Sequence, residues 1–263
     1  ELSGGGFSAN DSSVTSTGCI FVSNKSTRSN GGGATHVNGG SWNDANGTYT
    51  TNEATSSGGA ILWEDATGSI MDCIFTSNLN SSLGGGGALA IDSTSGPTLS
   101  GNEFRYNSSL SNGGAIYVDG TNSLIFLNTL FLGNHAMAGG SVSAWTTTGL
   151  TFSNCRFLGN EANATNDSFA NGGAVALSSS TNSTTFLNCV FSGNKANNNG
   201  GVLSADGSTR FVNCTLAGNS ANFGGVTTLF SGDSVSFENS ILWGNSAPSA
   251  GNDVFVNSQT ATV

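Results

Sequence analysis

Acidic side chains recur at one spacing in the first half of this chain, and they are the residues whose types could carry chemistry. Glu64, Asp92 and Asp119 each stand four residues after the position that follows a glycine pair, with Asp65 beside the first and Asp206 at the same spacing further along. Carboxylate oxygens are preferred Ca²⁺ ligands, and carboxylate pairs also hydrolyse glycosidic bonds. Glu64, Asp92 and Asp119 are therefore candidate calcium ligands and, in an alternative hypothesis, the acids of a polysaccharide lyase or hydrolase.

A structural explanation of these acids competes with both chemical ones. Asp119–Gly120 and Asp206–Gly207 are ordinary turn dipeptides, and stacked acids repel one another unless something neutralises them. A catalytic site also needs bases or cations nearby, and His36 and His135 do not share a position in the repeat. We therefore favour turns over calcium and calcium over catalysis, and we assign no catalytic residue and no cofactor other than the candidate calcium ion.

Cysteine is confined to one position of a repeat, five residues before a recurrent Asn. Three of the cysteines, Cys155, Cys189 and Cys214, fall in consecutive repeats. Side chains stacked in register run parallel, which keeps their Cβ atoms too far apart for a relaxed disulfide. Thiolates in single file also do not form a tetrahedral zinc site. We predict buried free thiols that act as small apolar fillers.

Two sequence motifs alternate along the whole chain, and they must position the acids and the cysteines. One is Gly-Gly followed by a small and then an apolar residue, and the other is Phe-x-x-Asn; each returns after roughly 27 residues. The closing Asn falls at Asn24, Asn52, Asn78, Asn107, Asn134, Asn160, Asn194, Asn219 and Asn245. Phe stands three residues earlier at Phe21, Phe75, Phe104, Phe131, Phe157 and Phe191. Residues after each glycine pair alternate in hydrophobicity, which is typical of a strand with one buried face.

The repeat predicts an all-β fold in which each unit is one coil of a β-solenoid. Equivalent residues would stack about 4.8 Å apart, and buried Asn residues would form ladders in which each amide hydrogen-bonds to the next. A second Asn, six residues before the closing one in five units, would stack in the same way. The glycine pairs would lie at corners that need positive φ.

Parallel crossovers are almost always right-handed. The predicted fold is therefore a single right-handed parallel β-helix spanning residues 1–263, with about nine to ten coils. Residues 161–171 are predicted to form a loop inserted into one coil.

Composition supports strands and excludes some partners. Charged residues make up 8% of the chain, against roughly 25% in a typical globular protein. Six Lys and Arg against sixteen Asp and Glu leave a net charge of -10, so nucleic acid is a poor partner. No apolar stretch is long enough for a transmembrane helix.

The paired phrases resemble those of the chlamydial polymorphic outer membrane proteins. The relevant sequences are GGAIL at 58, GGALA at 86 and GGAIY at 113, together with Phe-x-x-Asn. Those proteins are similar to autotransporter passenger domains, which are extracellular β-helices that act as adhesins or surface architecture. The resemblance implies a secreted protein that is extracellular or located at the cell surface.

Three functional hypotheses follow. The first is a non-enzymatic structural rod, whose ends do not look like caps and would self-associate head to tail into a filament. The second is an adhesin that binds a host protein or glycan through residues 161–171 or through Tyr117, Trp145, Phe230 and Trp243. The third is the carbohydrate-cleaving enzyme described above.

Overall fold

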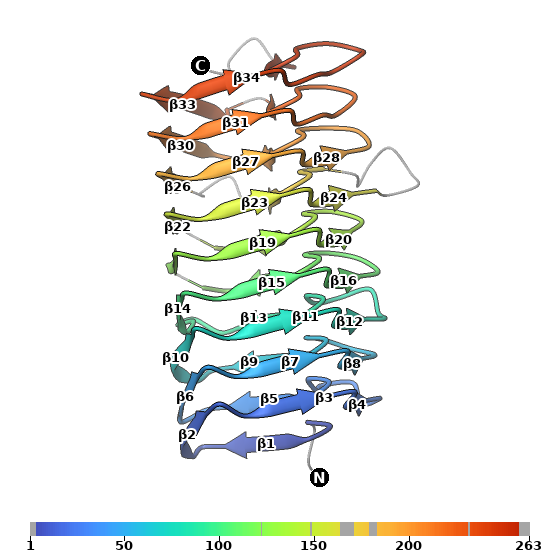
Figure 1. Ribbon diagram of the computed structural model, residues 1–263, viewed down its shortest axis with the longest axis vertical. Helices are drawn as coiled ribbons and strands as arrows, with labels where there is room; N and C mark the ends of the chain where they lie inside the picture. Colours follow the sequence, from blue (N-terminus) through green and yellow to red (C-terminus); the bar gives the residue numbers. More distant parts are fainter. Residues whose placement is uncertain are drawn as a thin grey trace.

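A computed structural model describes residues 4–121, 123–147, 149–163, 171–178, 183–230 and 232–257. In this part of the chain there are strands and no helix, and the strands wind into an upright stack of coils (Figure 1). Every strand pairing is parallel and joins one coil to the next. The predicted all-β parallel solenoid is therefore confirmed.

Three long parallel sheets, A, B and C, run along the stack, and a shorter sheet D accompanies them from β4 to β28. Sheet A follows the glycine pairs and consists of β1 (Phe7–Asn10), β5 (Thr35–Asn38), β9 (Ile61–Glu64), β13 (Leu89–Asp92), β17 (Ile116–Asp119), β21 (Val142–Trp145), β25 (Val175–Ser178), β29 (Leu203–Ala205), β32 (Thr227–Leu229) and β35 (Val254–Val256). Sheet B consists of β2 (Ser13–Thr17), β6 (Ser41–Ala45), β10 (Thr67–Met71), β14 (Thr98–Ser100), β18 (Leu124–Leu127), β22 (Gly149–Ser153), β26 (Ser183–Leu187), β30 (Ser208–Val212) and β33 (Ser234–Glu238).

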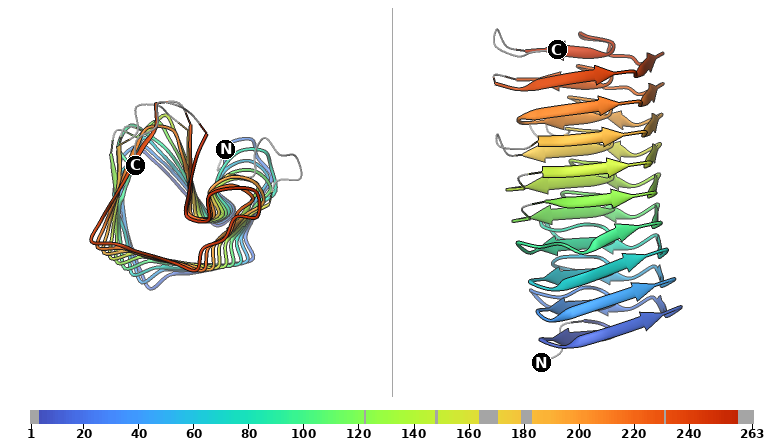
Figure 2. Two further views of the ribbon diagram at one scale, coloured as in Figure 1. Left: turned by 90° about the horizontal axis from the view of Figure 1, so that it is seen from above. Right: turned by 90° about the vertical axis from the view of Figure 1, so that its left-hand side faces the viewer.

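Sheets C and D complete each coil. Sheet C consists of β3 (Ile20–Val22), β7 (Thr48–Thr50), β11 (Ile74–Thr76), β15 (Glu103–Arg105), β19 (Leu130–Leu132), β23 (Arg156–Leu158), β27 (Val190–Ser192), β31 (Thr215–Ala217) and β34 (Ile241–Trp243). Sheet D consists of β4 (Lys25–Ser26), β8 (Glu53–Ala54), β12 (Leu79–Asn80), β16 (Ser108–Ser109), β20 (His135–Ala136), β24 (Glu161–Ala162) and β28 (Lys195–Ala196). Seen from above, sheets A, B and C enclose a wide core, and a narrower lobe beside it holds sheet D (Figure 2).

Aromatic rings stack in two files inside the wide core. In the sheet C file, Phe75 and Phe104 lie 4.7 Å apart between ring centroids, and so do Phe157 and Phe191. A second file on sheet B stacks Phe126 on Phe152 at 4.5 Å. The two files meet edge to face, as such rings prefer. The Phe of the repeat therefore supplies a continuous apolar core.

The closing Asn residues form a buried amide ladder. Asn134 donates from its backbone N and from Nδ2 to Oδ1 of Asn160, at 3.0 Å in each case, and also from Nδ2 to the carbonyl of Phe104. Its own Oδ1 accepts the same pair of bonds from Asn107. The ladder continues in this way from Asn24 to Asn245. Each rung therefore satisfies backbone and side-chain groups of its neighbours.

The second file of Asn residues differs from the buried ladder. Asn128, Asn154 and Asn188 are exposed and adopt φ values of 49°, 55° and 54°, the left-handed conformation that Asn tolerates well. Their amides make long contacts of 3.3 Å with one another. These residues form turns between sheets B and C, and the stacking is secondary.

The two glycines of a pair serve different purposes. The first often has positive φ, as at Gly113 and Gly139, which agrees with the corner interpretation. The second glycine, such as Gly114, does not have positive φ. A Cβ on Gly114 would overlap the carbonyl oxygen of Gly140 in the next coil and would crowd the backbone of His135 in sheet D. The second glycine is therefore needed because the start of sheet A passes directly against sheet D.

The amide ladder predicts a difference between the middle and the end of the stack. Asn134→Ala leaves buried partners on both neighbouring coils without hydrogen bonds, so we expect it to lower the free energy of unfolding by on the order of 3 kcal/mol. Asn24→Ala, in the half-buried first coil, should cost less than about 1 kcal/mol. Urea unfolding followed by circular dichroism measures both, and equal losses would contradict the ladder's role.

Candidate functional site: the outer face of sheet A

The predicted acids lie in one file on sheet A. Glu64 pairs in register with Asp92, and Asp92 pairs with Asp119. The next residue in the file is Trp145, which pairs with Asp119 and is followed by Ser178. We call Glu64, Asp92 and Asp119 the acidic file. The structure therefore brings together the three acids that the sequence singled out, and it places an aromatic residue directly after them.

Each end of the acidic file has its own polar partner. The Glu64 carboxylate lies 2.5 Å from Nε2 of His36, a buried histidine on the same face. Asp119 accepts hydrogen bonds from the Tyr117 hydroxyl, at 3.4 Å, and from the Thr146 hydroxyl. These contacts position the carboxylates at the two ends of the file.

Electrostatics in the file act most strongly on its middle member. The pKa of Asp92 is raised, first by its partial burial and then by the negative charges of Asp119, Glu64 and Asp65. The pKa of the Tyr117 hydroxyl is also raised by burial and by the nearby Asp119. Asp92 therefore keeps its proton to a higher pH than an isolated aspartate does.

The turn explanation of these acids has direct support in the backbone. Asp65 and Gly120 adopt φ values of 45° and 74° immediately after the strands that end in Glu64 and Asp119. A polar cavity of about 260 Å³ lies beside the file, between Asn30, Asn38 and the acids. Among the described residues, no group of three or more His, Cys, Asp or Glu side chains is arranged to hold a metal ion. Calcium therefore remains a prediction from the sequence.

The cysteines, five residues before the closing Asn, make hydrogen bonds as well as filling space. All five cysteines are free thiols. Each of Cys155, Cys189 and Cys214 directs its Sγ at a backbone carbonyl in the previous coil, at 3.3–3.5 Å. Where the repeat lacks cysteine, Asn102 and Ser240 donate to the equivalent carbonyls. In these coils a small hydrogen-bond donor at this position therefore satisfies a carbonyl of the previous coil.

A buried acid that the sequence analysis missed lies in the second coil. Asp44 is 1% exposed and lies between Ser16 and Ile70 in an inward file of sheet B whose later members are apolar. It accepts hydrogen bonds from the Tyr49 hydroxyl at 2.7 Å, from Ser16 at 2.6 Å and from the Cys73 thiol at 3.3 Å. The pKa of Tyr49 is raised well above its usual value by burial and then by Asp44. Two departures from the repeat in this coil could have revealed the buried acid. Asp44 stands where later coils have an apolar residue, and Tyr49 stands where most coils have Phe.

The stacked parallel strands define the class of protein, a β-solenoid with three long sheets and one short one. A family model described as the right handed beta helix region matches residues 1–157 and, in an overlapping match, residues 41–242. The chain therefore belongs to the right-handed β-helix family. No curated protein and no solved structure matches it. No helix in the described part of the chain is long and apolar enough to cross a membrane.

The Asp44 network predicts non-additive effects. Tyr49→Phe alone removes a donor from a buried carboxylate and should destabilise the fold by about 1–3 kcal/mol. The double variant Asp44→Leu/Tyr49→Phe copies the apolar pair that other coils use, Leu99 and Phe104. We expect it to be more stable than the sum of the single variants predicts, as in other replacements of buried charges by apolar groups. A double-mutant cycle in urea tests this, and simple additivity would contradict it.

The acidic file predicts a pH-dependent stability. Because the folded-state pKa of Asp92 is raised, its contribution to stability is fully present below the unfolded pKa of about 3.9 and is lost as pH rises through the folded-state value. Asp92→Asn should therefore have a higher Tm than the wild type at pH 7, and this advantage should shrink towards pH 3. Asp72→Asn, outside the file, controls for the general effect of removing one charge.

The same measurement of Tm tests whether the acidic file binds calcium. If the acidic file binds Ca²⁺, as the sequence predicts, Ca²⁺ should raise the Tm of the wild type more than Mg²⁺ does at equal ionic strength, and Asp92→Asn should abolish the difference. Equal effects of the two ions on the wild type would contradict the calcium site.

Proposed function

We propose that this chain is a non-enzymatic structural protein of the extracellular space or cell surface, acting as a stiff rod. The observation that carries the proposal is the unbroken register of the ladders, from Asn24 to Asn245 along the amide ladder and from Phe21 to Phe191 along the rings. In a solenoid each coil is held by its neighbours, so stability and stiffness accumulate along the axis.

Two observations support the extracellular location. The Gly-Gly and Phe-x-x-Asn phrases resemble those of chlamydial polymorphic outer membrane proteins, and we propose that the chain is related to them. The chain also has few charged residues, and its net charge is -10, which favours solubility of a long rod by mutual repulsion.

A more specific version of this proposal is that copies of the rod associate end to end. The first coil leaves strand edges that another chain can pair with. An apolar cavity of about 270 Å³ opens there between Phe7, Val14, Phe21 and Trp42. At the other end of the stack, Leu242 is only partly buried. We propose that the coil of a second copy covers these surfaces, which would build a filament because the contact is head to tail.

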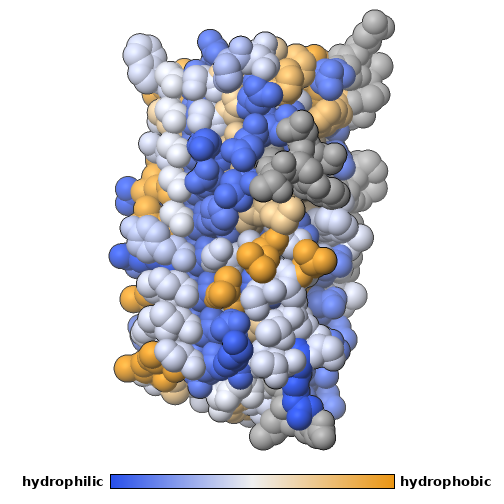
Figure 3. Space-filling view, turned by 90° about the vertical axis from the view of Figure 1, so that its right-hand side faces the viewer, coloured by the Kyte–Doolittle hydropathy of each residue, from blue (hydrophilic) through white to orange (hydrophobic). Residues whose placement is uncertain are grey.

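The adhesin hypothesis is a second proposal. Of its predicted contact segment, 161–171, residues 164–170 lie outside the described residues. The side that carries sheet D is largely hydrophilic, with hydrophobic residues gathered near mid-height (Figure 3). Two exposed apolar residues, Leu83 and Leu110, follow β12 and β16 of that sheet. The carbohydrate-cleaving hypothesis, with Glu64, Asp92 and Asp119 as its acids, ranks third.

Electron microscopy of the concentrated protein tests end-to-end association. We expect thin fibres from the wild type and short rods from Phe21→Asp, because the substitution places a charge in the open end of the ring file. Val22→Asp is the matched control: Val22 is the next residue of the same strand, 53% exposed on the outer face, and this variant should still form fibres. Circular dichroism verifies that both variants keep the coil stack. Short rods from the wild type at high concentration, or equal fibres from both variants, would overturn the filament proposal.

A further inference from the structure

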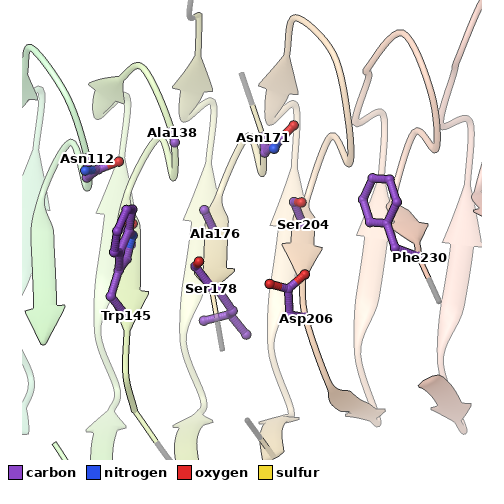
Figure 4. Close-up of a pocket in the computed structure, with 11 residues that line it drawn as sticks. Asn112, Ala138, Trp145, Asn171, Ala176, Ser178, Ser204, Asp206 and Phe230 are labelled. Atoms are coloured by element: carbon purple, nitrogen blue, oxygen red, sulfur yellow. The ribbon is translucent and has the colours of Figure 1, made fainter. Parts of the chain in front are cut away.

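A second hollow lies on the outer face of sheet A and begins at Trp145, one coil after the last member of the acidic file. It has a volume of about 250 Å³ and spans the coils of β21, β25 and β29 (Figure 4). Its floor includes Ser143, Ser178 and Ser204, and Asn112 and Asn171 contribute to its rim from the segments that precede the glycine pairs. We call this hollow the sheet A groove.

Two aromatic residues mark the ends of the sheet A groove. Trp145 lies at one end and Phe230 at the other, with Ser178 and Asp206 between them (Figure 4). Three coil steps of about 4.8 Å separate their coils, so the rings lie about 14 Å apart along the rod. Trp145 is 41% exposed although it is a large aromatic residue. Its indole is therefore available as a platform for a ligand.

The floor of the groove contains an unused hydrogen-bonding group. Ser143 lies between Val142 and Ala144 of the core, so its side chain points to the outer face. It is nevertheless only 1% exposed, and its hydroxyl has no hydrogen-bond partner in the described structure. A buried polar group without a partner costs free energy. A ligand hydroxyl would remove that cost.

Asp206 adds a carboxylate to the same groove. Its pKa is raised by partial burial and by the charge of Asp233, so the groove does not favour further negative charge. Asp119 is the register neighbour of Trp145 and extends the acidic character towards the groove. Anionic ligands are therefore disfavoured, while groups that donate hydrogen bonds to carboxylates and amides are favoured.

We propose that the sheet A groove binds a linear neutral oligosaccharide. Sugar rings present apolar faces that pack on aromatic side chains and a rim of hydroxyls that donate and accept hydrogen bonds. The groove offers both: flat rings at Trp145 and Phe230, a polar group at Ser143 beside Trp145, and polar groups at Ser178 and Asp206 between the two rings. A few polar groups placed in a partly apolar hollow are the usual composition of a ligand site. The long axis of the groove follows the rod, which suits an extended chain.

Isothermal titration calorimetry with cellohexaose, maltohexaose and a linear mannan hexasaccharide tests the proposal. We expect at least one of them to bind, and Trp145→Ala to weaken that binding by about tenfold or more, the scale of a central aromatic contact. Trp243→Ala is the matched control, because Trp243 is a 76% exposed tryptophan on sheet C. This variant should bind as the wild type does.

A second variant separates binding from folding. Ser143→Ala removes a hydroxyl that has no partner, so it should leave the Tm unchanged or slightly raised while weakening binding severalfold. A hexagalacturonate of the same length should bind at least tenfold more weakly than the best neutral sugar. Absence of binding by all three neutral sugars, equal effects of the two tryptophan variants, or preferred binding of the galacturonate would overturn the proposal. None of these outcomes depends on whether the rods associate end to end.

Discussion

The whole structure depends on pairing buried polar groups between coils. In this stack a coil has no helix or hairpin partner of its own, so its amides and carbonyls must be satisfied by the coil above or below. The Asn ladder meets this need at the inner turn after sheet C, where Oδ1 of each Asn accepts both the backbone and the side-chain N–H of the previous one. At the last rung the Asn245 amide instead donates to Asp253, 2.9 Å away.

Other features of the repeat follow from that close stacking. The second glycine of each pair lets the chain pass against sheet D without a side chain, as Gly114 does. The residue two positions after the closing Asn fills the narrow lobe and is usually small, as at Ala136, Ala162 and Ala196. Cys155, Asn102 and Ser240 occupy the same position of the repeat, and each donates to a carbonyl of the previous coil. The repeat is therefore a set of geometric requirements, which leaves the outward positions free to vary.

This division explains what could be predicted from the sequence. The fold and its register follow from inward residues such as Phe131 and Asn134, whose phase is set by stacking. The acidic file of Glu64, Asp92 and Asp119 could also be found, because a shared phase on one strand guarantees adjacency. The sheet A groove could not be found as a unit. Ser143 and Asn171 are separated by about one coil of sequence, and only the folded chain brings both to the same hollow. Asp44 was not predicted because its role depends on a hydrogen bond from one partner, the Tyr49 hydroxyl.

Hydrogen exchange of the Asn side-chain amides, measured by NMR, tests the central claim most directly. The account predicts that the carboxamide hydrogens of Asn107, Asn134 and Asn160 exchange orders of magnitude more slowly than those of the exposed turn residues Asn128 and Asn154. Asn128 and Asn134 belong to one coil, and Asn154 and Asn160 belong to the next, so these pairs are internally matched. If the ladder amides exchanged as fast as the turn amides, the buried amide ladder would not hold the stack together, and the account would be wrong.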